Sequence, residues 1–124
     1  MSAVNIKHIK DITPYEGPYK IEGINFRYAA KALGVSAWGM NILELEPGVT
    51  AYPTHDHSKD GQEEVYVILK GSAVLKAGDV EHQLKEGSLV RVAPEVTRHL
   101  SPGPQGVTIL ALGGTPGAVF QSQV

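Results

Sequence analysis

The chain has 124 residues, 42% hydrophobic and 19% charged, a length and composition that suit one globular domain and exclude a disordered or low-complexity chain. It contains no cysteine, which excludes disulfides, thiolate metal sites and cysteine nucleophiles. The net charge is −2 and the chain has no Lys/Arg cluster, so we expect no nucleic-acid partner and no binding to a membrane surface. No apolar run approaches the roughly 20 residues of a membrane span. Because a signal-peptide pattern is also absent, we expect a cytoplasmic protein.

The N-terminal part of the chain is predicted to be an extended arm over residues 1–25. Residues 11–25 contain two prolines and two glycines, which disfavour a regular helix or a central strand. The next stretch, residues 27–33, favours a helix and a strand equally. If it is a helix, Gly34 ends it, because glycine readily adopts the left-handed conformation found after many helix C-termini.

Six short apolar runs follow, each rich in branched or aromatic residues and too short for a convincing helix. These predicted strands are residues 40–45, 64–69, 72–76, 80–84, 88–92 and 107–112. Turn-forming pairs separate many of them, including Pro47-Gly48, Gly78-Asp79, Glu86-Gly87 and Pro102-Gly103. Gly78-Asp79 predicts a hairpin, because glycine accepts the positive φ of a two-residue hairpin turn. The pattern predicts an all-β fold in one domain over residues 1–124.

Residues suited to metal binding lie between positions 48 and 99. His55 and His57 are separated by one residue, so in an extended segment both imidazoles point to the same side. Glu64 opens a predicted strand, and His99 follows the predicted strand 88–92. Each is weak evidence alone, because single histidines and glutamates are common on protein surfaces. Together, three imidazoles and one carboxylate suit a divalent Fe, Mn, Ni, Co, Cu or Zn ion, with one or two coordination positions left open.

The spacing of glycines and prolines around these residues resembles the two motifs of the cupin superfamily. The first motif is Gly, five residues, His-x-His, three or four residues, Glu, six residues, Gly. Its counterpart in this chain spans residues 48–71 and consists of Gly48, His55, His57, Glu64 and Gly71. The second motif is Gly, five residues, Pro-x-Gly, two residues, His, three residues, Asn. Its counterpart spans residues 87–103 and consists of Gly87, Pro94, Val96, His99 and Gly103.

The spacing departs from the motifs at three places. Six residues separate Gly48 from His55 and Gly87 from Pro94, in each case one more than in the motif. Six residues also separate His57 from the glutamate, so both Glu63 and Glu64 are candidate ligands, on opposite faces of the strand. We favour Glu64, because its distance to Gly71 matches the first motif.

The resemblance implies a small jelly-roll β-barrel with the metal inside it, held by His55, His57, Glu64 and His99. It implies a dioxygenase, isomerase or decarboxylase acting on a small organic molecule, or alternatively a binding or sensing module that uses the metal to organise a pocket without turnover. A cupin fused to a helical DNA-binding domain is not expected. Five polar residues on or near the motif strands are weak candidates for catalytic roles: Tyr52, Gln62, Tyr66, Arg91 and Arg98. His8 and His82 are expected on the surface.

Two predicted strands, 64–69 and 107–112, carry apolar residues on both faces. A barrel strand with its outer face in water alternates apolar and polar residues, so these outer faces must be covered. The N-terminal arm could cover its own barrel or that of a second copy. Because a symmetric pair is the commonest closed oligomer, we expect a homodimer.

Overall fold

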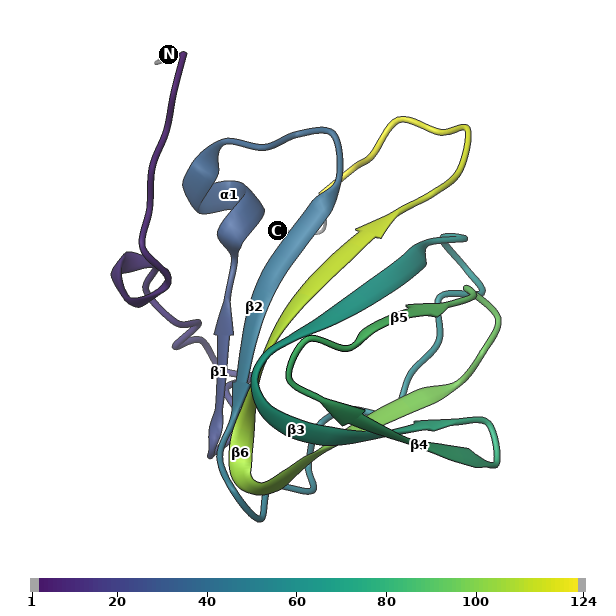
Figure 1. Cartoon of the computed structure of the whole chain (residues 1–124). Coiled ribbons are helices and arrows are strands. Elements are labelled where there is room, and N and C mark those ends of the chain that lie inside the picture. The colour runs from purple at the N-terminus through teal and green to yellow at the C-terminus, as the bar shows by residue number, and fades with distance from the viewer. Residues whose placement is uncertain (1–2, 123–124) are drawn as a thin grey trace.

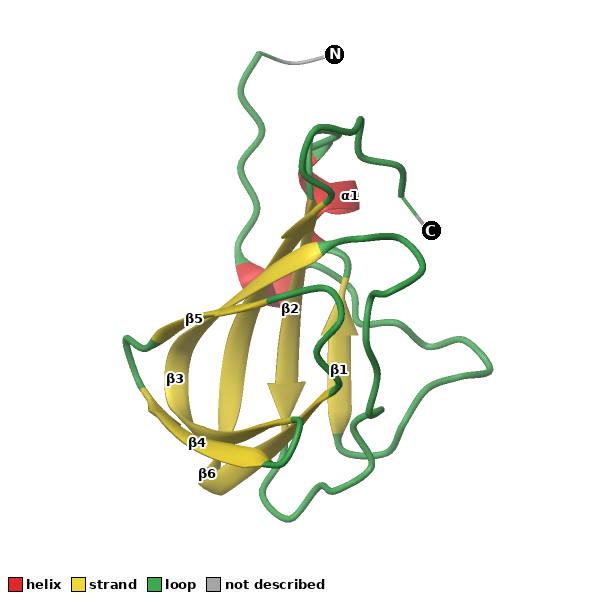
Figure 2. Ribbon diagram, turned by 90° about the vertical axis from the view of Figure 1, so that its right-hand side faces the viewer, coloured by secondary structure: helices red, strands yellow, loops and turns green. Residues whose placement is uncertain are grey.

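Six antiparallel strands within residues 3–122, the part of the chain that the computed structural model describes, form one strongly curved sheet (Figure 1). The strands are β1 (Ile24–Arg27), β2 (Gly39–Leu45), β3 (Glu63–Ala77), β4 (Val80–Lys85), β5 (Leu89–Val92) and β6 (Arg98–Gly114). Their order across the sheet is β1-β2-β6-β3-β4, and β5 pairs with the first part of β3. Figure 2 shows these strands curving round a common interior. The predicted all-β jelly-roll architecture is confirmed.

Two of the strands are longer than the sequence predicts. The predicted strands 64–69 and 72–76 are parts of one strand, β3, which runs through Gly71 without ending. Likewise β6 continues through Pro102-Gly103, which we predicted as a turn. The two long strands pair along most of their length, with shifts of register near the middle of β3. Local turn chemistry indicated breaks at these points because it does not reveal this pairing.

The strand β3 curves strongly (Figure 1), and Gly71 lies between the two register shifts in its pairing with β6. Its φ is 77°, and a Cβ at this position would overlap the carbonyl oxygen of Gly106 on β6. Glycine therefore meets two requirements at once, the left-handed backbone and the close approach of a neighbouring strand. The bend lets β3 contribute to both sides of the barrel.

The core fills the interior of this barrel. Tyr66 and Ile68 on β3, Leu100 and Ile109 on β6, and Leu43 on β2 are at most 1% exposed. Alternate residues of each strand point inward, as the period of two predicts. The β3–β4 hairpin has the predicted two-residue turn, since Ala77 pairs with Val80 across Gly78-Asp79.

The arm and the stretch after it contain more regular structure than predicted. Residues of the arm form a short 3-10 helix, η1 (Ile9–Asp11), and its end belongs to β1. Residues 27–33, for which the sequence favoured a helix and a strand equally, contain the last residue of β1 and then a helix, α1 (Ala29–Leu33). Gly34 follows this helix with a φ of 79°, as expected for the residue that ends it. Residues 1 and 2 of the predicted arm lie outside the described residues.

Part of the arm covers its own barrel. Ile12 packs with Ala29 of α1 against Ile42, on the outer face of β2. The Arg27 side chain secures this contact, because its Nη1 donates a hydrogen bond of 2.7 Å to the carbonyl oxygen of Ile12 and one of 3.2 Å to that of Ile9. Of the two arrangements left open for the arm, the structure thus shows the intramolecular one for this segment. Within residues 3–122, no helix is long and apolar enough to span a membrane.

Candidate metal centre

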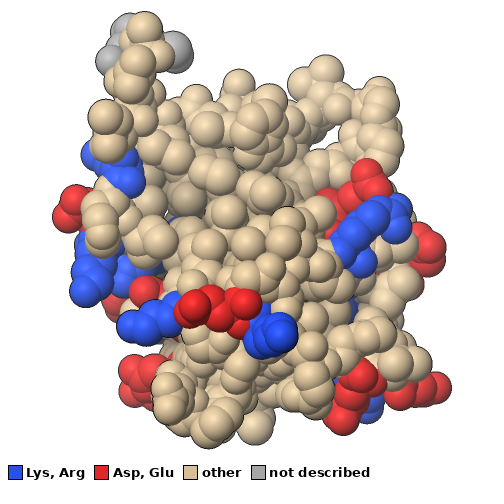
Figure 3. Space-filling model, viewed as in Figure 1, with Lys and Arg blue, Asp and Glu red and all other residues tan. Residues whose placement is uncertain are grey.

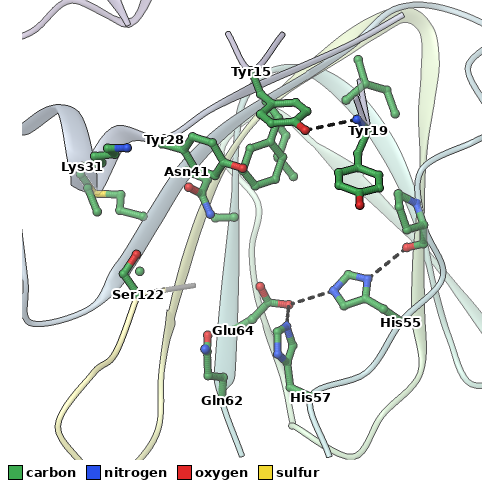
Figure 4. Close-up of a pocket in the computed structure, with 18 of the residues that line it drawn as sticks. Tyr15, Tyr19, Tyr28, Lys31, Asn41, His55, His57, Gln62, Glu64 and Ser122 are labelled. Atoms are coloured by element: carbon green, nitrogen blue, oxygen red, sulfur yellow. Dashed lines mark hydrogen bonds and ion pairs between the residues drawn. The ribbon is translucent and has the colours of Figure 1, made fainter. Parts of the chain in front are cut away.

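The loop between β2 and β3 brings His55 and His57 back over the sheet. The backbone N–H of His55 donates to the carbonyl of Arg98 at 3.1 Å and its carbonyl accepts from the N–H of Arg98 at 2.9 Å. The N–H of His57 donates to the carbonyl of Pro94 at 2.8 Å. This pairing holds the loop extended, so both imidazoles point to one side, toward Glu64 (Figure 4).

His55, His57 and Glu64 meet at one point. Oε1 of Glu64 lies 3.3 Å from Nε2 of His57 and 3.7 Å from Nε2 of His55. The three ligand atoms all lie within 4.8 Å of one another. A zinc ion bonds to nitrogen and oxygen ligands at about 2.0–2.2 Å, which places neighbouring ligands of one ion about 3–3.5 Å apart. The spacing and the donor atoms therefore fit a metal ion.

Of the two glutamates left open by the sequence, Glu64 is the one in this group. Glu63 lies on the opposite face of β3, where its Oε2 accepts a hydrogen bond of 2.6 Å from Nε of Arg91. The side chain of Arg91 is 60% exposed. This weak catalytic candidate thus forms a surface ion pair away from the histidines.

Hydrogen bonds behind the imidazoles fix their orientation. Nδ1 of His55 lies 3.0 Å from the carbonyl oxygen of Pro53, and Nδ1 of His57 lies 3.1 Å from both carboxylate oxygens of Asp60. In the tautomer that binds a metal, each Nδ1 carries the proton and donates it to these acceptors, and Nε2 is left to bond the metal. Asp60 was not among the predicted site residues, and its only signal in the sequence is its position three residues after His57.

Two donors hold the Glu64 carboxylate. Its Oε1 accepts a hydrogen bond of 2.7 Å from the Tyr66 hydroxyl and another from Nη1 of Arg98. Burial acts to raise the pKa of Glu64, but hydrogen bonds from His55 and Tyr66, with the charges of His57 and Arg98, outweigh it and lower the pKa overall. The carboxylate is therefore ionised at neutral pH, as a metal ligand must be.

The tyrosine candidates lie close to this carboxylate. Burial raises the pKa of Tyr66 and that of Tyr52 far above the ordinary value, and the negative charge of Glu64 adds to both shifts. Both hydroxyls consequently stay protonated and can donate hydrogen bonds. Tyr52 lines the neighbouring cavity, as does Gln62, whose Nε2 donates to Asp60 at 3.3 Å.

The structure does not bring His99 into the group. Arg98 and Leu100 are fully buried inside the barrel, so His99, between them on β6, points the other way. Its Nε2 lies 3.1 Å from the carbonyl oxygen of Thr50. The four residues predicted as ligands are thus separated into a group of three and a single histidine. His8 and His82 are exposed, as predicted.

A cavity of about 950 Å³ adjoins the His55–His57–Glu64 group. Figure 4 shows the group at one end of this cavity in the view and tyrosines at the other. Aromatic side chains are prominent in its lining: Tyr15, Tyr19, Phe26, Tyr28, Tyr52 and Phe120. Polar lining residues include Lys20, Lys31, Asn41, Gln62 and Ser122. Many of these residues belong to the arm, α1 and the C-terminal segment, which the sequence analysis did not assign to a site.

Comparisons with known proteins identify the architecture around this site. No family model matches the chain, and no curated protein matches it by sequence. A cupin protein from Bacteroides fragilis matches its structure with a TM-score of 0.66 and 19% identity, over 89% of this chain and 91% of that one. The chain has the cupin fold. A sugar phosphate isomerase of the cupin superfamily from Silicibacter pomeroyi shares it, with a TM-score of 0.71 and 23% identity over 90% of this chain and 77% of that one.

The cupin fold is shared with proteins of different activities. A predicted oxalate decarboxylase from Thermotoga maritima matches with a TM-score of 0.70 and 20% identity, over 88% of this chain and 97% of that one. At such identities the likeness concerns the fold, and the activity has to be argued from the site. The resemblance stated from the motifs is confirmed at the level of the fold.

Proposed function

We propose that this cupin binds a divalent transition metal through His55, His57 and Glu64 and uses it to act on a small organic molecule in the adjoining cavity. One observation carries the proposal: the Nε2 atoms of two imidazoles and one ionised carboxylate converge at the edge of a largely apolar cavity. Two histidines and one carboxylate are also the ligand set of non-haem Fe(II) oxygenases, which keep positions open for substrate and O₂.

A bound ion would supply Lewis acidity or oxygen activation. The chain's own residues prepare the site. Asp60 holds the His57 ring, while Tyr66 and Arg98 hold Glu64. The aromatic side chains of the cavity offer an apolar surface to the carbon skeleton of a substrate. Tyr52 and Gln62 lie where a hydroxyl or an amide can hydrogen-bond its oxygen atoms.

The reaction proposed is a dioxygenation, isomerisation or decarboxylation, and two structural neighbours are named for the second and third of these. Imidazole and carboxylate ligands accept Fe, Mn, Ni, Co, Cu or Zn, so the ligand set does not select one metal. The cytoplasm stays the predicted location.

A binding or sensing module without turnover is the alternative. The observation that favours it is that the cavity has few groups able to act as a base. The hydroxyls of Tyr52 and Tyr66 hold their protons, and Glu64 would be occupied by the metal. Few groups then remain to accept a proton from a substrate.

Elemental analysis of protein purified without a histidine tag tests the metal site and separates the two functions. Near-stoichiometric Fe or Mn, with O₂ uptake on diketones or phenols, would support the enzyme, and Zn without turnover would support the binding module. We expect His55→Ala and His57→Ala each to lower metal content at least tenfold in a protein that stays folded. The matched control is His82→Ala, on the exposed strand β4. Equal metal content in all four proteins would refute the site.

A further inference from the structure

The inward position at the start of β6 belongs to Arg98. Arg98 is 0% exposed, and it is paired across the backbone with His55. Side chains directly opposite each other in an antiparallel pair lie on the same face, with Cβ atoms about 4.5–5.5 Å apart. The Arg98 side chain therefore enters the barrel immediately beside the His55 imidazole, while His99 leaves on the other face.

The spacing of the second cupin motif gives two positions for its histidine. Counted from Pro94 the histidine position falls on His99, and counted from Gly87 with the motif's five-residue spacing it falls on residue 98. The extra residue between Gly87 and Pro94 moves His99 one position further along the chain. A shift of one residue turns a side chain to the opposite face of a strand. Residue 98 is the one that is buried and paired with His55, so the inward position is occupied by an arginine.

Each of the three nitrogens of the Arg98 guanidinium donates a hydrogen bond. Its Nε donates to the carbonyl of Val96 at 2.9 Å and its Nη2 to the carbonyl of Ala93 at 2.8 Å, while Nη1 donates to Glu64. The two backbone acceptors fix the plane of the guanidinium, so the third donor is directed at the carboxylate. Arginine stays protonated and offers no lone pair to a metal. Arg98 therefore cannot be a ligand, although it fills the place of one.

We propose that Arg98 is a positioning residue that stands in place of a fourth metal ligand. It holds the Glu64 carboxylate toward the two imidazoles and keeps the number of protein ligands at three, which leaves more of the metal's coordination sphere to substrate. This inference rests on the proposed metal site. It makes opposite predictions for residues 98 and 99, which are neighbours in the chain but face different sides of β6.

Co²⁺ titration of the purified protein, followed by calorimetry and visible absorption, tests the assignment. We expect His99→Ala to bind Co²⁺ with the affinity and spectrum of the wild type. Arg98→His places an imidazole beside His55, so we expect at least tenfold tighter binding and a changed spectrum as a fourth protein ligand enters. A tenfold loss or an altered spectrum in His99→Ala would overturn the assignment. So would an Arg98→His variant that is folded and unchanged in both measurements.

Arg98→Lys tests the positioning role separately. Lysine keeps the charge but cannot reproduce the planar fork of donors that reaches three acceptors. Loss of a group that orients a metal ligand typically lowers metal affinity about 10- to 100-fold, so we expect weaker Co²⁺ binding by about tenfold with an unchanged spectrum. Unchanged affinity would overturn the positioning role. If circular dichroism shows that Arg98→His is unfolded, His99→Ala and Arg98→Lys decide the question.

If the proposed metal site itself is wrong, the measurements differ from those above. The wild type then binds no Co²⁺, and His55→Ala does not change this result. Arg98→His then tests the inward position by itself. A gain of Co²⁺ binding would support the assignment of residue 98, and the absence of a gain in a folded variant would overturn it.

Discussion

The imidazoles of His55 and His57 depend on different partners for their orientation. His55 faces a backbone carbonyl, which no side-chain substitution removes, whereas His57 faces the carboxylate of Asp60. The carboxylate side chain is 38% exposed, so its removal has little effect on the core. The histidine ring, by contrast, loses the acceptor that fixes its tautomer.

We expect Asp60→Ala to lower metal affinity about 10- to 100-fold while the protein keeps its fold. Calorimetric titration with Zn²⁺ or Co²⁺ measures the change. The matched control is Asp79→Ala, an exposed aspartate in the turn between β3 and β4. An Asp60→Ala variant with wild-type affinity would show that the Asp60 contact does not orient the ligand.

Protonation of His55 predicts how metal binding depends on pH. The hydrogen bond to Glu64 raises the pKa of His55, and burial, which acts to lower it, is outweighed. Since a metal takes the unprotonated nitrogen, affinity is complete above this pKa and falls as the pH decreases through it. We expect the apparent affinity to start falling while the pH is still above about 6.5, the pKa of a free imidazole. Calorimetric titration with Co²⁺ at several pH values between 8 and 5 measures this, and an affinity that stays constant down to pH 5 would contradict it.

At the scale of the elements, the bend of β3 depends on one glycine. Gly71→Ala must place a methyl group on the Gly106 carbonyl and hold alanine at a φ of 77°. Strain of the backbone alone costs about 1–3 kcal/mol, and the overlap adds to it. We expect the free energy of unfolding to fall by about 3 kcal/mol or more, as measured by denaturant titration.

Gly48 provides the control for this prediction. Its φ is 83°, but no atom lies within 4 Å of a Cβ built on it. Gly48→Ala therefore carries the backbone strain without the overlap, and we expect the smaller loss of about 1–2 kcal/mol. Equal losses for the two variants would show that the close approach of β3 and β6 adds nothing.

At the scale of the whole molecule, part of the outer sheet surface stays apolar. The arm covers Ile42 on β2, but Leu69 on β3 is 39% exposed and Leu89 on the neighbouring strand β5 is 72% exposed. On the face shown in Figure 3, acidic and basic residues are interspersed and leave a broad uncharged area between them. We propose that a second copy covers the apolar face of β3 and β5, in a symmetric pair.

Light scattering at micromolar concentration should then give about twice the chain mass of 13.3 kDa. Leu89→Lys introduces a charge on the proposed interface and should yield the monomer. Val119→Lys is the control, because Val119 is 89% exposed but lies in the C-terminal segment outside the sheet. A wild-type mass of one chain would refute the homodimer.

The sequence by itself determined the β architecture, the hairpin at Gly78-Asp79 and the common side of His55 and His57. These features follow from local rules, whereas Glu64 was assigned to the same site from the resemblance to the cupin motifs. Alternation with a period of two sets which residues share a face, and turn residues mark where a strand reverses. The spacing of Glu64 to Gly71 also distinguished the correct carboxylate from Glu63.

Only the tertiary structure decided which face of each segment is inside. Side chains alternate in direction along a strand, so the sequence predicts that Arg98 and His99 face opposite ways. The pairing of residue 98 with His55 determines that the arginine is the one that points inward. The same holds for the length of β3 and β6, since their pairing overrides turn residues within them. The cavity wall likewise combines the arm, α1 and the C-terminal segment, which are distant in the chain. Local sequence carries periodicity, whereas inside and outside are set by contacts between segments far apart in the chain.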